Sequence, residues 1–290
     1  MGSKDFLAED ILAWRKNLLS KGGNTQDLDW LIDVAGGLGW TALQKLYLYP
    51  KSIVRMNISL RELSEIWQIH LHQAKPLQYL VGKCPWRDFE LEVTKDVLIP
   101  RQETELLVEI AFKKVKYQQK GVWVDLGTGS GAIAIAMARF LTDWQGHATD
   151  CSQSALFVAQ KNFKRLSPNS KIDFHLGNWW EPIERMDSLI HLAIANPPYI
   201  PKAVLEKLEP IVRDNEPHLA LCGGKDGLDS LRELVKGAFP CLRAGGWLIF
   251  EHHFDQSEKV MNLLLDSGFK DVDYENDLQG IPRFAIGRKP

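Results

Sequence analysis

The sequence predicts an α/β protein whose larger part is a doubly wound, mostly parallel sheet. From residue 122 onward, apolar runs of strand length alternate with segments of helical periodicity, the pattern of a parallel sheet covered by helices. A glycine-rich turn follows the first of these runs and leads into a helix, as in sheets that bind nucleotides. The chain before residue 76 has only helical periodicity, so we expect a separate small helical bundle there.

The helical bundle is expected over residues 1–75. Apolar side chains such as Ile11 and Leu18 recur at helical spacing and would form its core. Ser59 and Glu62 have the spacing of a capping box, which predicts the start of a last helix. We therefore assign the apolar stripes of this region to packing between helices.

A connector is expected over residues 76–99, ahead of a main domain over residues 100–290. The connector contains three strand-like runs, LQYLVG, DFELEV and VLIP, which predict a β-hairpin. Pro100 and Thr104 then suit the entry of the first helix of the main domain.

The main domain contains enough apolar runs for a seven-stranded sheet. The last two runs are close together and predict an antiparallel pair. The expected strands cover residues 122–124, 147–150, 172–176, 189–195, 245–252, 270–274 and 283–287. The expected helices between them cover residues 132–138, 152–166, 226–242 and 255–267.

Composition narrows the class of protein and its compartment. The chain has 290 residues, of which 45% are hydrophobic and 25% charged, so a sizeable core is expected. Its formal charge of −2 lacks the basic excess of a duplex-binding protein, which disfavours nucleic acid as a partner. The first ten residues contain no apolar signal core, and no run reaches the length of a membrane span.

The cysteines support a cytoplasmic location. They are widely separated and form neither a C-x-x-C pair nor a metal-binding pattern with the histidines, so we expect reduced thiols and no metal site. The four residues are Cys84, Cys151, Cys222 and Cys241.

The glycine-rich turn predicts a nucleotide-like ligand. Gly127, Gly129 and Gly131 allow positive φ angles and a close approach to the backbone, and the helix start supplies free N–H groups. Asp150 ends the next strand about twenty residues later, where its carboxylate can accept hydrogen bonds from ribose hydroxyls. The turn also fits a dinucleotide fingerprint loosely, so it predicts adenosine and leaves the chemistry open. Trp179, after the third strand, would either stack on the adenine or simply bury its ring at the rim.

A second turn, Asn196-Pro197-Pro198-Tyr199, follows the fourth strand and predicts a clamp for a planar –NH2 group. The two prolines stop the strand and stiffen the turn. Asn196 then offers its amide oxygen, Pro197 its backbone carbonyl and Tyr199 an aromatic face. Taken alone, the same four residues also suit an ordinary turn.

Two charged residues, Arg101 and Glu103, stand where the connector becomes a helix. They would either face a binding site or form a solvated helix cap. The glycine turn, Asp150 and the Asn-Pro-Pro-Tyr turn each follow a predicted strand, so they converge on one edge of the sheet.

With these residues identified, the chain resembles the class I S-adenosylmethionine-dependent methyltransferases, and specifically the PrmC/HemK family of release factor glutamine N5-methyltransferases. The resemblance covers nearly the whole chain. It implies a Rossmann-like methyltransferase sheet and methylation of the glutamine in the Gly-Gly-Gln loop of class I peptide-chain release factors. The motifs that support it are PLQYLVG, VLIPRQETE, VDLGTGSGAIAIA, ANPPYI, EPHLALCGGKDGL and DLQGIPR.

The resemblance also implies a role for each matching residue. The cofactor S-adenosylmethionine would contact the turn, the ribose carboxylate, the adenine-flanking tryptophan and the clamp asparagine, namely Gly127, Thr128, Gly129, Ser130, Gly131, Asp150, Trp179 and Asn196. The substrate glutamine would contact Asn196, Pro197, Pro198 and Tyr199, with Asn196, Pro197 and Tyr199 as the catalytic set. The helical domain would help to hold the release factor.

Two departures from the family pattern stand out. Gln102 replaces a usual proline, which we expect to loosen its turn. Phe250-Glu251-His252-His253 replaces a usual Glu-Ile-Gly run at a strand end, which places His252 and His253 near the site edge. Adjacent histidines point in different directions on a strand and have no partner ligands in the pattern, so we treat them as structural variation.

The predicted chemistry is methyl transfer to an amide nitrogen held by Asn196 and Pro197, accelerated mainly by positioning and local electrostatics. An adenine-N6 DNA methyltransferase is the nearest alternative, because the same clamp accepts an amine on a flipped base. A nicotinamide oxidoreductase would explain the glycines but leaves the Asn-Pro-Pro-Tyr turn without a role. A non-catalytic cofactor-binding module is the third alternative.

Overall fold

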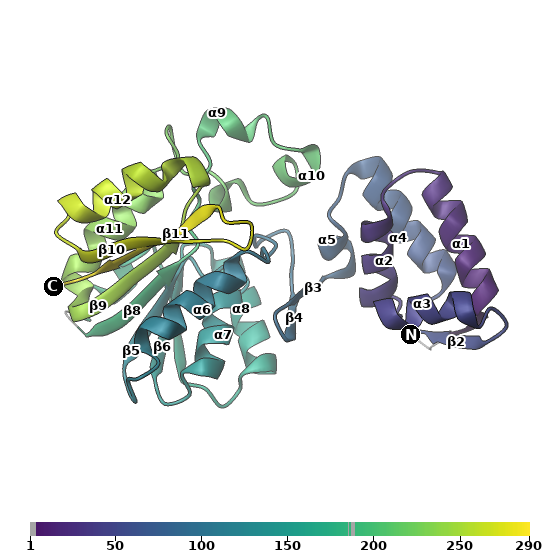
Figure 1. Ribbon diagram of the computed structural model, residues 1–290, viewed down its shortest axis with the longest axis horizontal. Coiled ribbons are helices and arrows are strands. Elements are labelled where there is room, and N and C mark those ends of the chain that lie inside the picture. The colour runs from purple at the N-terminus through teal and green to yellow at the C-terminus, as the bar shows by residue number, and fades with distance from the viewer. Residues whose placement is uncertain (1–3, 185, 187–188) are drawn as a thin grey trace. The chain divides into compact units, whose positions relative to one another are not determined.

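The computed structural model describes residues 4–184, 186 and 189–290 (Figure 1). Contacts divide the chain into two compact units, Met1–Pro85 with Pro210–Asn215, and Trp86–Glu209 with Glu216–Pro290. We call them the N-terminal unit and the catalytic-type unit and describe each by itself. The first three of the ten residues in which no apolar signal core is expected lie outside the described residues. Among the described residues, no helix has both the length and the apolar character that a membrane crossing needs.

The N-terminal unit is a helical bundle with a core that includes Ile11, Leu31 and Trp67. Ser59 caps the helix after it through the predicted box, accepting from the Glu62 N–H while the Glu62 carboxylate accepts from the Ser59 N–H. The helices are α1 (Ala8–Ser20), α2 (Thr25–Val34), α3 (Trp40–Leu48), α4 (Leu60–Gln73) and α5 (Leu77–Val81).

The N-terminal unit also contains two short strands that the sequence did not predict. β1 (Lys4–Leu7) pairs antiparallel with β2 (Ile53–Met56). Each strand has four residues and is mostly exposed, so neither shows the apolar alternation that reveals a half-buried strand. The expectation of purely helical structure before residue 75 was wrong at these two places.

The expectation of a strand at LQYLVG was also wrong, because this run forms helix α5. The Pro76 carbonyl accepts from the N–H groups of Tyr79 and Leu80 at 3.2 Å, which starts the helix. Gly82 ends it with a φ of 75° while its N–H donates to the Gln78 carbonyl at 2.8 Å. The hairpin that follows is shorter than expected and consists of β3 (Lys83–Trp86) and β4 (Phe89–Glu92).

The catalytic-type unit is built on a seven-stranded sheet in the order β10-β11-β9-β8-β5-β6-β7. The pairs within β9-β8-β5-β6-β7 are parallel, whereas β10 and β11 join the edge as antiparallel strands. The strands are β5 (Val122–Leu126), β6 (Gln145–Asp150), β7 (Ile172–Leu176), β8 (Ile190–Ala195), β9 (Leu242–Glu251), β10 (Lys270–Asn276) and β11 (Pro282–Arg288). This order confirms the predicted doubly wound, mostly parallel sheet.

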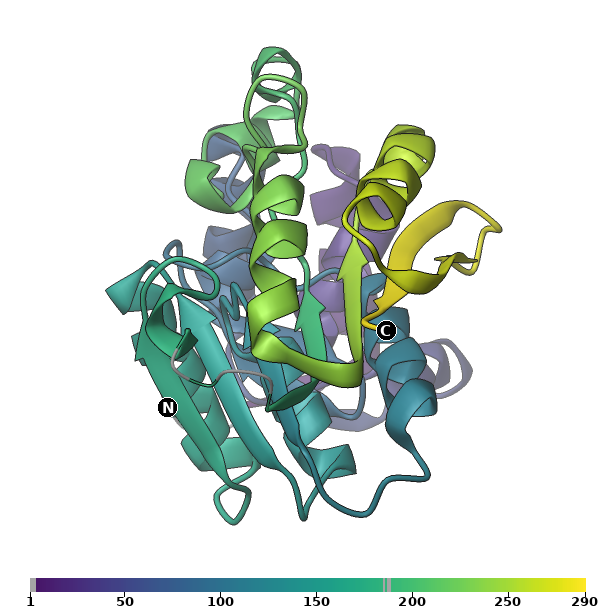
Figure 2. The same ribbon diagram turned by 90° about the vertical axis from the view of Figure 1, so that its left-hand side faces the viewer.

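Helices cover both faces of this sheet (Figures 1 and 2). Helices α6, α7 and α8 lie on one face and α11 and α12 on the other, so the central strands are buried on both sides. The bounds are α6 (Thr104–Val115), α7 (Ala132–Phe140), α8 (Gln153–Leu166), α11 (Asp229–Cys241) and α12 (Ser257–Asp266).

The connectors after β7, β8 and β9 contain short helical turns. They are η1 (Glu181–Ile183), α9 (Lys202–Leu205), α10 (Pro210–Arg213), η2 (His218–Ala220) and η3 (Phe254–Gln256). The segment that contains α10 groups with the N-terminal unit, where the Asn215 side chain donates to the Ala74 carbonyl at 2.9 Å. The long connector after β8 is therefore largely ordered into short helical turns.

Candidate functional site

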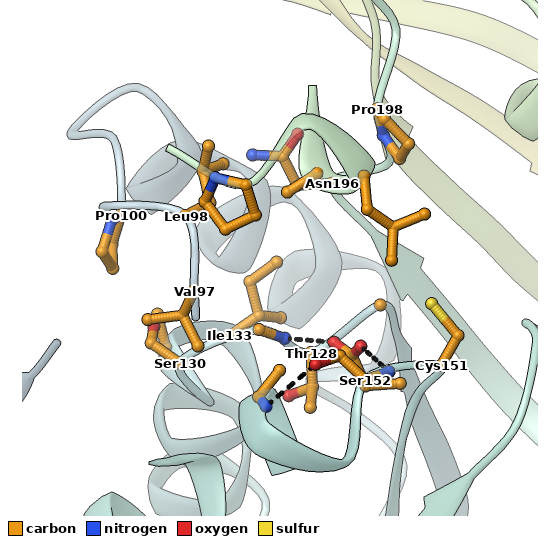
Figure 3. Close-up of a pocket in the computed structure, with 18 of the residues that line it drawn as sticks. Val97, Leu98, Pro100, Thr128, Ser130, Ile133, Cys151, Ser152, Asn196 and Pro198 are labelled. Atoms are coloured by element: carbon orange, nitrogen blue, oxygen red, sulfur yellow. Dashed lines mark hydrogen bonds between the residues drawn. The ribbon is translucent and has the colours of Figure 1, made fainter. Parts of the chain in front are cut away.

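A cavity of about 260 Å³ lies at the carboxyl ends of β5, β6 and β8 in the catalytic-type unit. Figure 3 shows Thr128, Ser130 and Ser152 on one side of it and Asn196 and Pro198 on the other. The predicted site residues that line it are Arg101, Gly127, Thr128, Gly129, Ser130, Asp150, Trp179, Asn196 and Pro198. Gly131, Pro197, Tyr199 and Glu103 are not among its lining residues.

The glycine turn is held mainly by backbone hydrogen bonds to the neighbouring strand. The N–H groups of Gly127 and Thr128 both donate to the Thr149 carbonyl of β6 at 2.9 Å. Gly131 caps α7 with a φ of 84°, and a Cβ there would lie 3.2 Å from Ala159. Glycine is therefore required at this position both for the backbone conformation and for the close packing of α7 on α8.

Asp150 fixes the middle of the turn. Its Oδ2 accepts from the Gly129 N–H at 2.8 Å and its Oδ1 from the Ser152 N–H at 2.9 Å. Burial raises the pKa of this carboxyl above its ordinary value. Each oxygen has a second lone pair, so the carboxylate can still accept from a ligand hydroxyl.

Asp125 is a buried residue next to the glycine turn. It was not among the predicted site residues. Its Oδ2 accepts from the Thr128 hydroxyl at 2.7 Å and from the Ala134 N–H at 3.1 Å, whereas Oδ1 has no partner among the described residues. Burial raises the pKa of Asp125 to about 7, and Asp150 adds to the rise. Asp125 is not among the residues that line the cavity, so it can influence a ligand there only through its charge.

Trp179 both lines the cavity and packs against the core of the unit. It lines the cavity, and its ring lies 3.1 Å from the position that a Cβ on Gly127 would occupy. It also packs against the buried core and has a φ of 45°, an uncommon value for a non-glycine residue. The tryptophan therefore forms a fixed wall beside the glycine turn.

The Asn-Pro-Pro-Tyr turn is held by side chains from distant parts of the chain. The Asn196 Nδ2 donates to the Thr104 Oγ1 at 3.0 Å. The Tyr199 hydroxyl donates to the Glu251 Oε1 at 2.9 Å, and the Gln256 Nε2 donates to the Tyr199 carbonyl at 2.9 Å. In the described part of the chain, neither the Asn196 Oδ1 nor the Pro197 carbonyl accepts a hydrogen bond.

Glu251 and Thr104 join these contacts into one buried network. The Thr104 hydroxyl donates to the Glu251 Oε2 at 2.7 Å, and both residues are almost fully buried. Burial raises the pKa of Glu251, although its hydrogen bonds from Thr104 and Tyr199 oppose the rise. Thr104 lies in the VLIPRQETE motif and Glu251 in the run that departs from the family pattern. Nothing local in the sequence indicates that they meet, because they are 147 residues apart.

Glycines of the EPHLALCGGKDGL stretch let that loop pack on the back of the turn. A Cβ on Gly223 would lie 2.8 Å from the Pro198 carbonyl oxygen and from the Tyr199 Cα. Gly227 has a φ of 80°, and a Cβ there would lie 2.4 Å from the Tyr199 carbonyl oxygen. Larger residues at these places would displace the Asn-Pro-Pro-Tyr backbone.

Arg101 and Glu103 have different surroundings. Arg101 lines the cavity and donates to the Glu216 Oε1 at 2.7 Å, while the other oxygen of Glu216 accepts from the Ile99 N–H at 3.2 Å. Glu216 is buried and joins the VLIPR segment to the loop before η2. Glu103 is exposed at the N-terminal end of α6.

The departures from the family pattern lie around this network. Gln102 is exposed, and its carbonyl accepts from the Glu105 N–H at 3.0 Å in the turn that leads into α6. His252 is buried, with its Nδ1 bonded to the His253 carbonyl at 2.8 Å. His253 points to Asp255 at 2.6 Å, and its ring centre lies 6.3 Å from that of Tyr199. Neither histidine lines the cavity.

Comparisons with known proteins agree with this geometry. A family model described as "Methyltransferase small domain" matches residues 102–225. The hMettl16 catalytic domain, solved in complex with MAT2A 3′UTR hairpin 6, superimposes with a TM-score of 0.57 at 13% identity, over 94% of this chain and 91% of that one. At that identity the likeness shows the fold alone.

Proteins related in sequence identify the family. A release factor glutamine methyltransferase of Prochlorococcus marinus is 56% identical over 98% of this chain and 98% of its own. Proteins of the same name from Synechocystis sp. and Gloeobacter violaceus are 38% and 36% identical over 99% and 94% of this chain, and over 99% and 95% of their own. The resemblance inferred from the motifs is confirmed, and the chain belongs to the family of release factor glutamine methyltransferases.

Proposed function

We propose that this protein transfers a methyl group from S-adenosylmethionine to the side-chain amide nitrogen of the glutamine in the Gly-Gly-Gln loop of class I peptide-chain release factors. The observation that carries the proposal is that the glycine turn and Asn196 open into one cavity. A methyl donor and an amide acceptor bound to these two walls would lie side by side.

The cofactor side of the cavity binds S-adenosylmethionine. The backbone of residues Gly127 to Gly131 lies along the bound cofactor. Asp150 accepts from the ribose hydroxyls, and Trp179 flanks the adenine. The carboxyl groups of Asp125, which is fully buried, and of Asp150, which lines the cavity, suit a cationic ligand. The bound cofactor supplies an electrophilic methyl group on a positively charged sulfur.

The acceptor side holds the glutamine amide. An amide nitrogen is a weak nucleophile because its lone pair is delocalised into the carbonyl. The Asn196 Oδ1 and the Pro197 carbonyl accept its two N–H groups, which fixes the amide plane and draws electron density toward nitrogen. Tyr199 packs near the flat group, and Pro198 closes the wall of the cavity.

Arg101 and Glu103 contact the substrate loop, Arg101 at the cavity wall and Glu103 outside the cavity. Arg101 lines the cavity while its partner Glu216 fixes one side of the guanidinium. Glu103 is exposed two residues further along, at the start of α6. Both side chains would bind backbone groups on either side of the glutamine.

The N-terminal unit binds the protein substrate. Its helix α3 carries three large apolar side chains at helical spacing on one exposed face, Trp40, Tyr47 and Leu48. Exposed apolar side chains in such a cluster are typical of protein contacts. Because the relatives are release factor glutamine methyltransferases, we propose that the protein bound at this surface is the release factor.

We also propose that the protein acts as a monomer in the cytoplasm, without direct contact with nucleic acid. The formal charge of −2 disfavours a nucleic-acid partner, and widely spaced cysteines suit a reducing compartment. Light scattering of the purified protein tests the oligomeric state.

The test of the function is methyl transfer from isotopically labelled S-adenosylmethionine to three acceptors. These are an intact class I release factor, the same factor with its loop glutamine changed to alanine, and unmethylated duplex DNA. Label on the intact factor alone is expected. Label on DNA would favour an adenine methyltransferase, and no label despite measurable cofactor binding would favour a binding module.

A further inference from the structure

We propose that Glu251 and Thr104 are positioning residues that fix which way the Asn196 side-chain amide faces. This inference rests on the proposed function, because it concerns the same acceptor wall. Neither residue needs to touch the substrate. They act through Asn196 and, for Glu251, through Tyr199 as well.

Three separate elements bring these side chains together. Thr104 is the first residue of α6, Glu251 the last residue of β9, and Asn196 follows the end of β8. Thr104 is 4% exposed and Glu251 1% exposed, so water does not compete for their hydrogen bonds. The chain of contacts runs from Asn196 Nδ2 to Thr104 Oγ1 at 3.0 Å and from Thr104 Oγ1 to Glu251 Oε2 at 2.7 Å.

The number of hydrogens in this chain determines its direction. A threonine hydroxyl has one hydrogen, and Thr104 donates it to the carboxylate of Glu251. The Thr104 oxygen can then only accept from Asn196, and Nδ2 is the only side-chain atom of Asn196 that can donate a hydrogen bond. If the Asn196 side-chain amide were rotated by 180°, its oxygen would face the lone pairs of the Thr104 Oγ1. The network therefore keeps Nδ2 on Thr104 and leaves Oδ1 for another donor.

This orientation is the one that the reaction needs. The substrate amide presents a donor –NH2 group, so the asparagine must present an acceptor. A reversed Asn196 would direct its own –NH2 group at the substrate –NH2 group, and neither could accept. The other oxygen of Glu251 accepts from the Tyr199 hydroxyl at 2.9 Å, so one carboxylate orients two residues of the acceptor wall.

Two substitutions at Thr104 separate this role from simple packing. Thr104→Ser keeps the hydroxyl, whereas Thr104→Val keeps the shape and removes it. We expect Thr104→Val to lower kcat for the release factor about 10- to 100-fold, because Asn196 loses the partner that orients it. Thr104→Ser should stay within about 3-fold of the parent protein, and cofactor affinity measured by calorimetry should stay unchanged in both.

Glu251→Gln tests the other end of the network. A glutamine must direct its –NH2 group at either Thr104 or Tyr199, so one of the two hydroxyls can no longer donate there. We expect a kcat loss similar to that of Thr104→Val, again with cofactor affinity retained. This variant decides the question if Thr104→Val fails to bind the cofactor.

Single-turnover rates in an Asn196→Ala background show whether Thr104 acts through Asn196. Adding Thr104→Val there should cause no further loss, because the group that it orients is already absent. A wild-type kcat in Thr104→Val, equal losses in Thr104→Ser and Thr104→Val, or a further full loss in the double variant would each overturn the inference. Failure of the parent protein to methylate the factor would instead overturn the proposed function.

Discussion

The two turns that line the cavity are stabilised in different ways. The glycine turn is held by backbone hydrogen bonds to the adjacent strand β6 and by Asp150 at its end. The Asn-Pro-Pro-Tyr turn is held by side chains that lie 52 to 92 residues away in the chain, Thr104, Glu251 and Gln256. The glycine turn, which forms the cofactor wall, is thus held by the neighbouring strand. The Asn-Pro-Pro-Tyr turn, which forms the acceptor wall, depends on side chains from distant parts of the chain. Substitutions should therefore separate cofactor binding from methyl transfer.

The largest separation is expected from Asn196→Ala. Removing the acceptor oxygen should lower kcat by about 10²- to 10³-fold, the usual cost of losing one preorganised polar group at a reacting centre. Cofactor affinity should change little, because the glycine turn makes no hydrogen bond to Asn196 in the described chain. Calorimetry and labelled methyl transfer measure the two quantities. Asn169→Ala, at an exposed asparagine of the same unit, is the matched control.

Gly227→Ala tests whether the loop that contains Gly227 must pack so closely on the Asn-Pro-Pro-Tyr turn. Its φ of 80° is nearly that of Gly245, at 76°, but a Cβ on Gly245 would meet nothing within 4 Å. Gly245→Ala should cost about 1–2 kcal/mol for the backbone alone. Gly227→Ala should cost at least about 2 kcal/mol more, because the added methyl group meets the Tyr199 carbonyl.

Urea denaturation of the two glycine variants measures this difference. Gly227→Ala should also lose methyl transfer, whereas Gly245→Ala should retain it. Equal stabilities for the two variants would contradict the packing described for the acceptor wall.

The pH dependence of cofactor binding tests the carboxyl of Asp125, which lies next to the glycine turn. Burial raises the pKa of Asp125 to about 7 in the free protein, so its carboxyl is protonated below that pH and charged above it. A cationic ligand favours the charged form and lowers this pKa, so binding below pH 7 must release a proton. The Kd should be level above about pH 7 and rise up to about 10-fold for each pH unit below it.

Asp125→Asn is the control for this pH effect, because an amide keeps the shape and cannot ionise. Its Kd should depend less on pH over the same range. An unchanged pH profile in the variant would assign the effect to another group, such as Asp150.

Trp40→Ala separates protein binding from both turns and should have the smallest effect. The KM for the release factor should rise about 10-fold, a typical loss for one exposed aromatic anchor, with kcat and cofactor affinity unchanged. Tyr117→Ala, which removes an aromatic side chain that is 88% exposed on the catalytic-type unit, should leave KM unaltered. Equal KM values for both variants would remove the support for α3 as a contact surface.

The same contrast between the turns explains what the sequence could predict. The strands of the main sheet, the glycine turn and Asp150 are local patterns, and the structure has them near their expected places. Leu77–Val81 was misassigned because a short, mostly apolar run suits a strand and a helix equally well. Pro76 and Gly82, which bound the run, favour the helix.

The network behind the acceptor wall could not be predicted from one sequence. Thr104 and Glu251 each have an unremarkable local pattern, one at a helix start and one at a strand end. Their meeting depends on how α6 packs over β8 and β9, which is a property of the folded sheet. Asp125 was overlooked for a related reason, because only its burial distinguishes it from an ordinary turn residue.

The most direct test of the central claim is to locate the methyl group by mass spectrometry. A class I release factor would be incubated with S-adenosylmethionine and either the parent protein or Asn196→Ala, then digested and sequenced by fragmentation. The account predicts one methyl group on the side-chain amide of the loop glutamine with the parent protein and almost none with Asn196→Ala. A methyl group on any other residue, or full methylation by Asn196→Ala, would contradict it.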